Sequence, residues 1–274
     1  PESLAMLDAG GVPAFRSVET CAETIAMLFD APPKTDTSVD MTLPRSAAKL
    51  IDTLGAGIQD EVTSARVMQE LGVTAPASVV LDPKMSLPED IPVPFPVVAK
   101  LVSSDLPHKT EAGAIHVGIK DRAELIAAIA AMKTAAQAHR PGYRLAGILV
   151  QQMCTGLGEA LIGITRDPVA GPMITVAMGG VMTEIYRDSA VRPAPVDLAA
   201  ARAMIAEVKG FALLSGYRNR PKGDLDALAH AVTAVSRLAN SGRIEEAEIN
   251  PILVRPEGEG VVMLDALLHV GRDS

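Results

Sequence analysis

Short runs of Val, Ile and Leu recur along this 274-residue chain, and Gly, Pro or polar residues bound most of them. Such runs predict strands, whereas longer segments in which apolar residues return every three or four positions predict helices. Strands are predicted at residues 77–81, 97–102, 115–119, 148–153, 160–165, 173–177, 249–254 and 261–264, and helices at 18–29, 61–71, 122–138, 198–208 and 225–239. Because the two element types do not alternate strictly, their order predicts an α/β or α+β fold with mixed sheets rather than a simple doubly wound sheet.

The chain exceeds the usual size of a single compact domain, which predicts two lobes with shared or adjoining cores. Residues 31–45 are rich in Pro, Thr and Asp and lack an apolar period, as is typical of a linker. We therefore expect a boundary there. Residues 1–45 would form a short tail plus the linker, and residues 46–274 would form lobes at roughly 46–145 and 146–274.

The charge and the cysteines restrict the class of protein. A net charge of −8 and a pI near 5.2 disfavour general nucleic-acid binding, which needs a basic surface. Cys21 and Cys154 show no spacing typical of a disulfide framework or a zinc site, which favours reduced thiols. No apolar run approaches the roughly 20 residues that span a bilayer, and the N-terminus lacks the pattern of a signal peptide. We expect a soluble, cytoplasmic protein that binds neither nucleic acid nor membrane.

The first candidate site lies in residues 95–119, where an apolar strand carries Lys100 and runs into a polar loop with His108 and Lys109. A buried lysine needs an anionic partner, so this pattern predicts a cationic cradle for phosphate oxygens. Alternatively, Lys100 extends to the surface and the loop is a solvated hairpin. An imidazole is a competent nucleophile near neutral pH, so His108 could carry a phosphoryl group, although a lone histidine is usually structural.

The second candidate site lies in residues 147–167, which have the pattern of a strand, a short connector and a second strand. In a nucleotide pocket, the backbone of Gln151 to Met153 could face the edge of an adenine, and Glu159 could accept hydrogen bonds from ribose hydroxyls. Taken alone, an ordinary hairpin with one outward-facing glutamate explains the same pattern.

The third candidate site begins at the glycine pair Gly179 and Gly180. Without side chains, these residues would let backbone amides approach phosphate oxygens closely. Arg192 follows in a charged stretch and could pair with a phosphate in a forked geometry. A glycine pair between two strands is, however, also the usual composition of a simple turn.

The fourth candidate site lies in residues 244–270. Glu248 and Asn250 alternate along one predicted strand, so both side chains point to the same face. Asp265 follows on a second predicted strand after a turn. Carboxylate and amide oxygens from paired strands are ligands that Mg²⁺ prefers, with nucleotide phosphates completing its coordination. The alternative is a hairpin with polar outer residues.

Together, the four stretches resemble the ATP-grasp domain of the ADP-forming acyl-CoA synthetases, and more distantly the nucleotide-binding subunit of succinyl-CoA synthetase, over residues 46–270. The resemblance implies an ATP-grasp fold whose two lobes enclose ATP or ADP. It implies that Lys100 and Lys109 hold the phosphates of the nucleotide. It also implies that Gln151 to Met153 contact the adenine and that Glu159 lies at the ribose. Asn250 and Asp265 would hold Mg²⁺, and Glu248 would lie near a phosphohistidine that moves between sites. In this family the loop matching His108 and Lys109 carries a histidine that receives phosphate.

The resemblance also implies a reaction and partners. An acid, CoA and ATP would be converted reversibly to acyl-CoA, ADP and phosphate through a phosphohistidine and an acyl phosphate. Residues 10–30 resemble the tail of a ligase domain, which implies a longer parent chain. Coenzyme A would enter through upstream CoA-binding and ligase domains or a partner subunit in a homo- or hetero-oligomer, and this fragment would be incomplete for the full reaction.

The sequence departs from the family pattern at two positions. Ala114 stands where the family usually has a glycine pair. Gln151 stands where the succinyl-type subunit tends to have an acid, so the preference between an adenine and a guanine nucleotide stays open. Three other functions also stay open. They are a nucleotide-sensing module that regulates an acyltransferase, an ATP-grasp ligase that joins an acid to an amine without His108, and a structural subunit without nucleotide affinity.

Overall fold

The computed structural model describes residues 17–30, 41–106, 109–179 and 188–272, together with Met6 and Gly10. Residues 1–40 and 41–274 form separate compact units, so each is described by itself. In the first unit, helix α2 (Val18–Asp30) follows Ser17, whose hydroxyl accepts a hydrogen bond from the N–H of Thr20 at 3.1 Å. A serine in this position caps the first turn of a helix, which explains where α2 begins.

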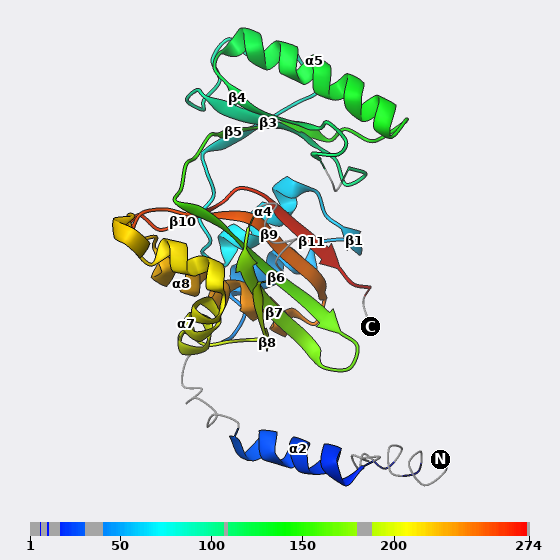
Figure 1. Cartoon of the computed structure of the whole chain (residues 1–274). Coiled ribbons are helices and arrows are strands. Elements are labelled where there is room, and N and C mark those ends of the chain that lie inside the picture. Colours follow the sequence, from blue (N-terminus) through cyan, green and yellow to red (C-terminus); the bar gives the residue numbers. More distant parts are fainter. Residues whose placement is uncertain are drawn as a thin grey trace. The chain divides into compact units, whose positions relative to one another are not determined.

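The second unit contains a seven-stranded sheet, called the large sheet below (Figure 1). Its strands lie in the order β1 (Gly57–Ile58), β11 (Ala266–Val270), β9 (Ile244–Val254), β6 (Gly158–Asp167), β7 (Gly171–Met178) and β8 (Ser189–Pro193), and β10 (Val261–Met263) pairs with β9. Buried residues of helices α3 (Arg45–Asp52), α4 (Glu61–Glu70), α7 (Leu198–Glu207) and α8 (Leu225–Ser236) share one hydrophobic core with this sheet. Short 3-10 helices lie at η1 (Lys209–Leu214), η2 (Tyr217–Asn219) and η3 (Arg237–Ser241).

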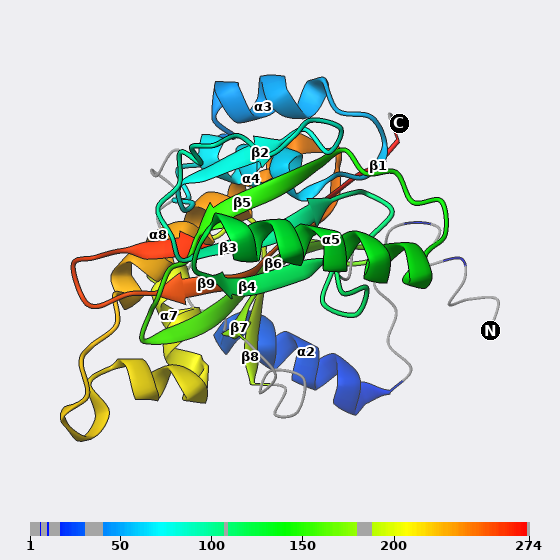
Figure 2. The ribbon, with the colours of Figure 1, turned by 90° about the horizontal axis from the view of Figure 1, so that it is seen from above.

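A four-stranded sheet, called the small sheet below, has a second hydrophobic core of its own. Its strands lie in the order β2 (Ser78–Leu81), β5 (Gly147–Gln152), β3 (Val97–Val102) and β4 (Ile115–Ile119). Helix α5 (Arg122–His139) lies across one face of this sheet (Figure 2). The helix begins at Asp121, whose side chain accepts a hydrogen bond from the N–H of Glu124 at 2.8 Å.

Alternation along β3 decides which side chains face α5. Val97, Ala99 and Leu101 are buried in the core that they share with residues of α5. Successive strand residues point to opposite faces of a sheet, so Lys100 points to the face that α5 leaves uncovered. Gln151 lies on this same face, because it pairs with Val98 in the register of β3 and β5.

The predicted fold class is confirmed, although every described strand pair is antiparallel where mixed sheets were expected. Each predicted strand and helix is present, and the largest shift is at β9, which begins at Ile244 where residue 249 was expected. Among the described elements, the sequence did not predict β1, β8, β11 and α3, nor the short 3-10 helices η1 and η2. Within the described ranges, no helix has both the length and the apolar character needed to cross a membrane.

The sheets do not divide at residues 145 and 146 as expected. β1 lies in the expected first lobe, residues 46–145, but it pairs with β11 in the large sheet. β5 lies in the expected second lobe, residues 146–274, but it pairs with β2 and β3 in the small sheet. The small sheet is therefore built from residues 78–152, between two segments that build the large sheet. Hydrophobic periodicity locates a strand but does not show its pairing partner, so the sequence alone did not assign each strand to a sheet.

Candidate functional site

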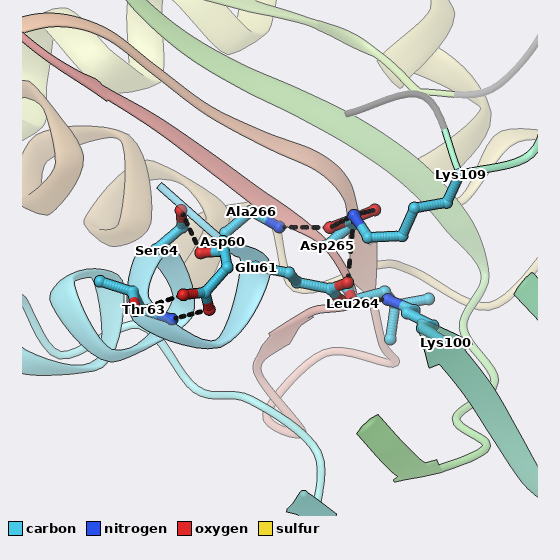
Figure 3. Close-up of polar contacts among 9 residues, drawn as sticks. All are labelled: Asp60, Glu61, Thr63, Ser64, Lys100, Lys109, Leu264, Asp265 and Ala266. Carbon is cyan, nitrogen blue, oxygen red and sulfur yellow. Dashed lines mark hydrogen bonds and ion pairs between the residues drawn. The ribbon is translucent and has the colours of Figure 1, made fainter. Parts of the chain in front are cut away.

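Lys100 on β3 is almost completely buried, with 3% of its surface exposed. Its ammonium group lies 2.5 Å from Oε1 of Glu61 and 2.6 Å from the carbonyl oxygen of Leu264 (Figure 3). A buried ammonium group is costly unless it is paired and hydrogen-bonded, and these two oxygens meet that need. The structure therefore excludes the alternative in which Lys100 extends to the surface.

Glu61 is the first residue of α4, and the local sequence fixes where it lies. Asp60 caps the helix by accepting hydrogen bonds from the N–H and the hydroxyl of Thr63, both at 2.9 Å. The hydroxyl of Ser64 donates to the carbonyl oxygen of Asp60 at 2.9 Å. These bonds satisfy polar groups of the first helical turn, so the carboxylate of Glu61 extends from a well-anchored helix start.

Lys109 completes a network of two lysines and two carboxylates. Its ammonium group lies 3.1 Å from Oε2 of Glu61, and 3.4 and 3.5 Å from the two carboxylate oxygens of Asp265 (Figure 3). Burial raises the pKa of Glu61 and Asp265 adds to this, while Lys100 and Lys109 oppose the increase. Burial by itself would lower the pKa of Lys109, but Glu61 and Asp265 outweigh this and raise the pKa.

A cavity of about 410 Å³ lies beside this network. It is lined by residues of strands β1, β4, β9 and β11, of α4 and of the adjoining loops: Ile58, Gln59, Glu61, Ser103, Leu106, Lys109, Thr110, Glu111, Ile115, Glu246, Glu248, Asn250, Asp265, Ala266 and Leu267. The predicted alternation along β9 is confirmed, because Glu246, Glu248 and Asn250 all line the cavity. Carboxylates outnumber cations among the lining residues, so a bound polyphosphate would need additional positive charge.

Asn250 and Asp265 lie together at this cavity and fit a magnesium ion held jointly with phosphates. The backbone N–H of Asn250 donates to the carbonyl oxygen of Asp265 at 3.2 Å, which ties the two residues to each other. Asp265 lies between β10 and β11, where the sequence pattern placed it within a strand. The described residues contain no cluster of three or more His, Cys, Asp or Glu side chains placed to hold a metal. Mg²⁺ is usually held by one or two protein carboxylates plus substrate phosphates, so this small oxygen set suits it.

Gln151 and Met153 do not line this cavity. Gln151 is 7% exposed and lines a smaller cavity of about 160 Å³, which shares Glu61 and Asp265 with the first. The N–H of Met153 donates to the carbonyl oxygen of Pro96 at 3.1 Å, so this donor already has a partner within the fold. The adenine contacts expected of this connector stay a prediction.

Glu159 on β6 lies beside Gly179, which directly follows the neighbouring strand β7. The N–H of Gly179 donates to the carbonyl oxygen of Glu159 at 2.7 Å. A side chain at Gly179 would place its Cβ 2.9 Å from the Cβ of Glu159 and 3.0 Å from the backbone nitrogen of Ala160. Close packing against β6 therefore accounts for this glycine, and its N–H is already used. The phosphate contact of Gly179 and the ribose contact of Glu159 stay predictions.

Three other predicted residues also lie apart from the cavity or outside the described residues. Arg192 on β8 contacts the carboxylate of Glu207 in an ion pair and does not line the cavity, because β8 is the edge strand beside α7. His108 and Gly180 lie outside the described residues. Lys109, which follows His108 in the chain, does line the cavity.

The main functional candidate missed from the sequence is Glu61. The sequence contained a signal for Glu61, because a lysine on a buried strand, here Lys100, needs an anionic partner. The sequence analysis predicted only phosphate as that partner. A carboxylate in the first turn of a capped helix is a common arrangement, so nothing in the local pattern singled out this glutamate. Its pairing with Lys100 spans 39 residues of chain and depends on tertiary structure.

Comparison with known proteins shows similarity to one domain family and to several enzymes. A family described as an ATP-grasp domain (ATP-grasp_5) matches residues 53–270. The chain is 30% identical to acetate–CoA ligase (ADP-forming) I of Archaeoglobus fulgidus, over 95% of this chain and 39% of that enzyme. It is 31% identical to the beta subunit of acetate–CoA ligase (ADP-forming) II of Pyrococcus furiosus, over 80% of this chain and 96% of that subunit. The chain thus spans about two fifths of the longer relative.

A solved structure shows the same fold. Acetyl-coenzyme A synthetase 1 of Ca. Korarchaeum cryptofilum, in complex with coenzyme A and Ca-AMPCP, matches with a TM-score of 0.71 and 27% identity. The match covers 79% of this chain and 94% of that chain. Nearly all of that solved chain is therefore similar to part of this one.

Proposed function

Because this chain belongs to the ATP-grasp family, we propose that it binds ATP or ADP with Mg²⁺ as the nucleotide-binding part of an ADP-forming acyl-CoA synthetase. The observation that carries this proposal is the meeting of Lys109 with Asn250 and Asp265 at one cavity, beside the buried Lys100. These residues come from both sheets of the second unit or from the loops next to them. Two cations for phosphate and two oxygen ligands for a metal are the groups that phosphoryl transfer requires.

Phosphate binding would redistribute the charges of this network. Lys100 and Lys109 would offset charge on the phosphates, and Asn250 and Asp265 would hold Mg²⁺. The metal, when bound, neutralises charge on phosphate oxygens. Glu246, Glu248 and Glu111 line the same cavity and would repel a bare polyphosphate, which supports a requirement for the metal.

His108 would be the group that accepts the phosphoryl group. A ring nitrogen of the neutral imidazole would attack the terminal phosphorus of ATP, the P–N bond would form as the bond to the bridging oxygen breaks, and ADP would leave. Lys109 is adjacent in sequence, so its ammonium group would lie near the transferred charge. Glu248 lines the cavity and would lie close to the resulting phosphohistidine.

The complete reaction would need further domains. An acid, CoA and ATP would give acyl-CoA, ADP and phosphate, reversibly, through an acyl phosphate on CoA-binding and ligase domains. Two relatives support this division, because the chain matches 39% of one long enzyme and 96% of a separate beta subunit. Residues 1–45 would then be the tail of a preceding ligase domain plus its linker.

The test is phosphorylation of the purified chain by ATP labelled in its γ-phosphate, in the presence of Mg²⁺. We expect an acid-labile, base-stable label in the wild type and none in His108→Ala. His116→Ala is the matched control, because His116 is an exposed histidine on β4, and it should be labelled like the wild type. Label that persists in His108→Ala would remove the role of His108. Binding of Mg-ATP without label in any variant would overturn phosphoryl transfer and favour a nucleotide-sensing module.

A further inference from the structure

Glu61 contacts both lysines of the site through its two carboxylate oxygens. Oε1 lies 2.5 Å from the ammonium group of Lys100, and Oε2 lies 3.1 Å from that of Lys109. The side chain of Glu61 is only 2% exposed, and that of Lys109 is 10% exposed. Both ammonium groups are therefore arranged around one buried carboxylate.

The helix that carries Glu61 is fixed within the core of the large sheet. Val67 and Met68 of α4 are completely buried in that core. The hydrogen bonds of Asp60 hold the first turn, so the carboxylate has little freedom to follow a moving lysine. Lys100 and Lys109, by contrast, belong to the small sheet and to the loop after it.

We propose that Glu61 is a positioning residue that holds Lys100 and Lys109 in place for the transferred phosphoryl group, an inference that rests on the proposed function. Lysine has a flexible four-carbon stem, and its charge helps a reaction most when it is already in place. A carboxylate would repel phosphate directly, so Glu61 acts through the lysines and not on the nucleotide. Glu61 thereby links the position of the small sheet to the core of the large sheet.

The test separates positioning from nucleotide binding. Glu61→Gln keeps the size of the side chain and removes its charge, and Glu61→Asp keeps the charge on a shorter side chain. We expect Glu61→Gln to slow single-turnover phosphorylation by roughly tenfold or more. The Kd for Mg-ATP should stay within about threefold or become tighter, because a negative charge near the phosphates is lost. Glu61→Asp should recover part of the rate, and Glu70→Gln, at the exposed end of the same helix, should match the wild type.

A second readout needs no catalysis. Acylation of lysines by acetic anhydride, followed by mass spectrometry, should be faster at Lys109 in folded Glu61→Gln than in the wild type or Glu70→Gln. Unchanged phosphorylation and unchanged Lys109 acylation in folded Glu61→Gln would overturn the proposal. If the wild type fails to form a label, the proposed function fails. Faster acylation of Lys109 would then still show that Glu61 positions this lysine.

Discussion

Asn250 and Asp265 are joined by a backbone hydrogen bond of 3.2 Å, from the N–H of Asn250 to the carbonyl oxygen of Asp265. The bond links β9 to the segment between β10 and β11 and sets both side chains at one cavity. The carboxylate of Asp265 also lies 3.4 Å from the ammonium group of Lys109. Mg²⁺ would therefore compete with Lys109 for this carboxylate.

The first prediction concerns the dependence of nucleotide binding on Mg²⁺. Asp265→Asn keeps the shape of the side chain but removes the charge that attracts both Mg²⁺ and Lys109. We expect the gain in ADP affinity on adding Mg²⁺ to fall by about tenfold, because a neutral amide is a weaker ligand for this ion. ADP affinity without the metal should be retained or increase, since Lys109 is released toward phosphate. Isothermal titration calorimetry with and without Mg²⁺ measures both values.

A matched control for this experiment is Asp226→Asn. Asp226 is exposed and pairs with Arg202 on the surface, away from the residues that line the cavity. It should behave like the wild type at both metal concentrations. An undiminished gain on adding Mg²⁺ in Asp265→Asn would contradict the metal assignment.

The second prediction concerns the stability of the Lys100–Glu61 pair. Lys100→Met leaves the buried carboxylate of Glu61 without its closest cation. Removing one partner of a buried ion pair typically lowers the free energy of unfolding by about 3 kcal/mol or more. The double variant with Glu61→Gln should lose less than the sum of the two single variants, because no uncompensated charge remains. Urea unfolding of all four proteins measures this coupling, and strictly additive losses would contradict it.

The third prediction concerns Arg192 and Glu207. Their ion pair is half-exposed, joins the edge strand β8 to α7 and lies away from the cavity. We therefore expect Arg192→Ala and Glu207→Ala to change the free energy of unfolding by less than about 1 kcal/mol each. The Kd for Mg-ATP should stay within about twofold in both. If only Arg192→Ala weakened ATP binding by tenfold or more, Arg192 would be shown to contact phosphate.

Much of the fold was predictable because the strand and helix patterns are strong. The run from Val97 to Val102 and the helix from Arg122 were found at their observed starts. β8 and β11 are five residues each, and the sequence pattern did not predict either of them. The pairing of β5 between β2 and β3 depends on contacts across the chain, which periodicity does not contain.

The candidate site was predictable where neighbouring residues share a strand face. Glu248 and Asn250 were placed together by alternation alone, and both line the cavity. Glu61 was missed because its partner is distant in sequence. Gly179 and Arg192 show the limit of residue type alone, since in this structure Gly179 bonds to the backbone of Glu159 and Arg192 pairs with Glu207 on the surface, and their phosphate contacts stay predictions.

The last prediction concerns Asp224, which caps α8 and also holds the turn before β10. Its carboxylate accepts hydrogen bonds from the N–H groups of Ala227, Gly258 and Gly260 at 3.0, 2.9 and 3.0 Å. Burial would raise the pKa of Asp224, but these donors outweigh it and lower the pKa below its ordinary value. A lowered pKa in the folded state contributes stability above the unfolded pKa of about 3.9, and this is lost as the pH falls through the folded value.

Asp224→Asn should therefore lower the free energy of unfolding by about 1 to 2 kcal/mol at pH 7, because one amide oxygen cannot replace both carboxylate oxygens. The difference from the wild type should begin to shrink as the pH falls below about 4, because the unfolded chain binds a proton at Asp224 before the folded protein does. Urea unfolding at pH 7 and pH 3 measures the effect, with the exposed Glu70→Gln as the control. A difference that stays constant between the two pH values would show that the charge of Asp224 contributes nothing, and that only the shape of the cap matters.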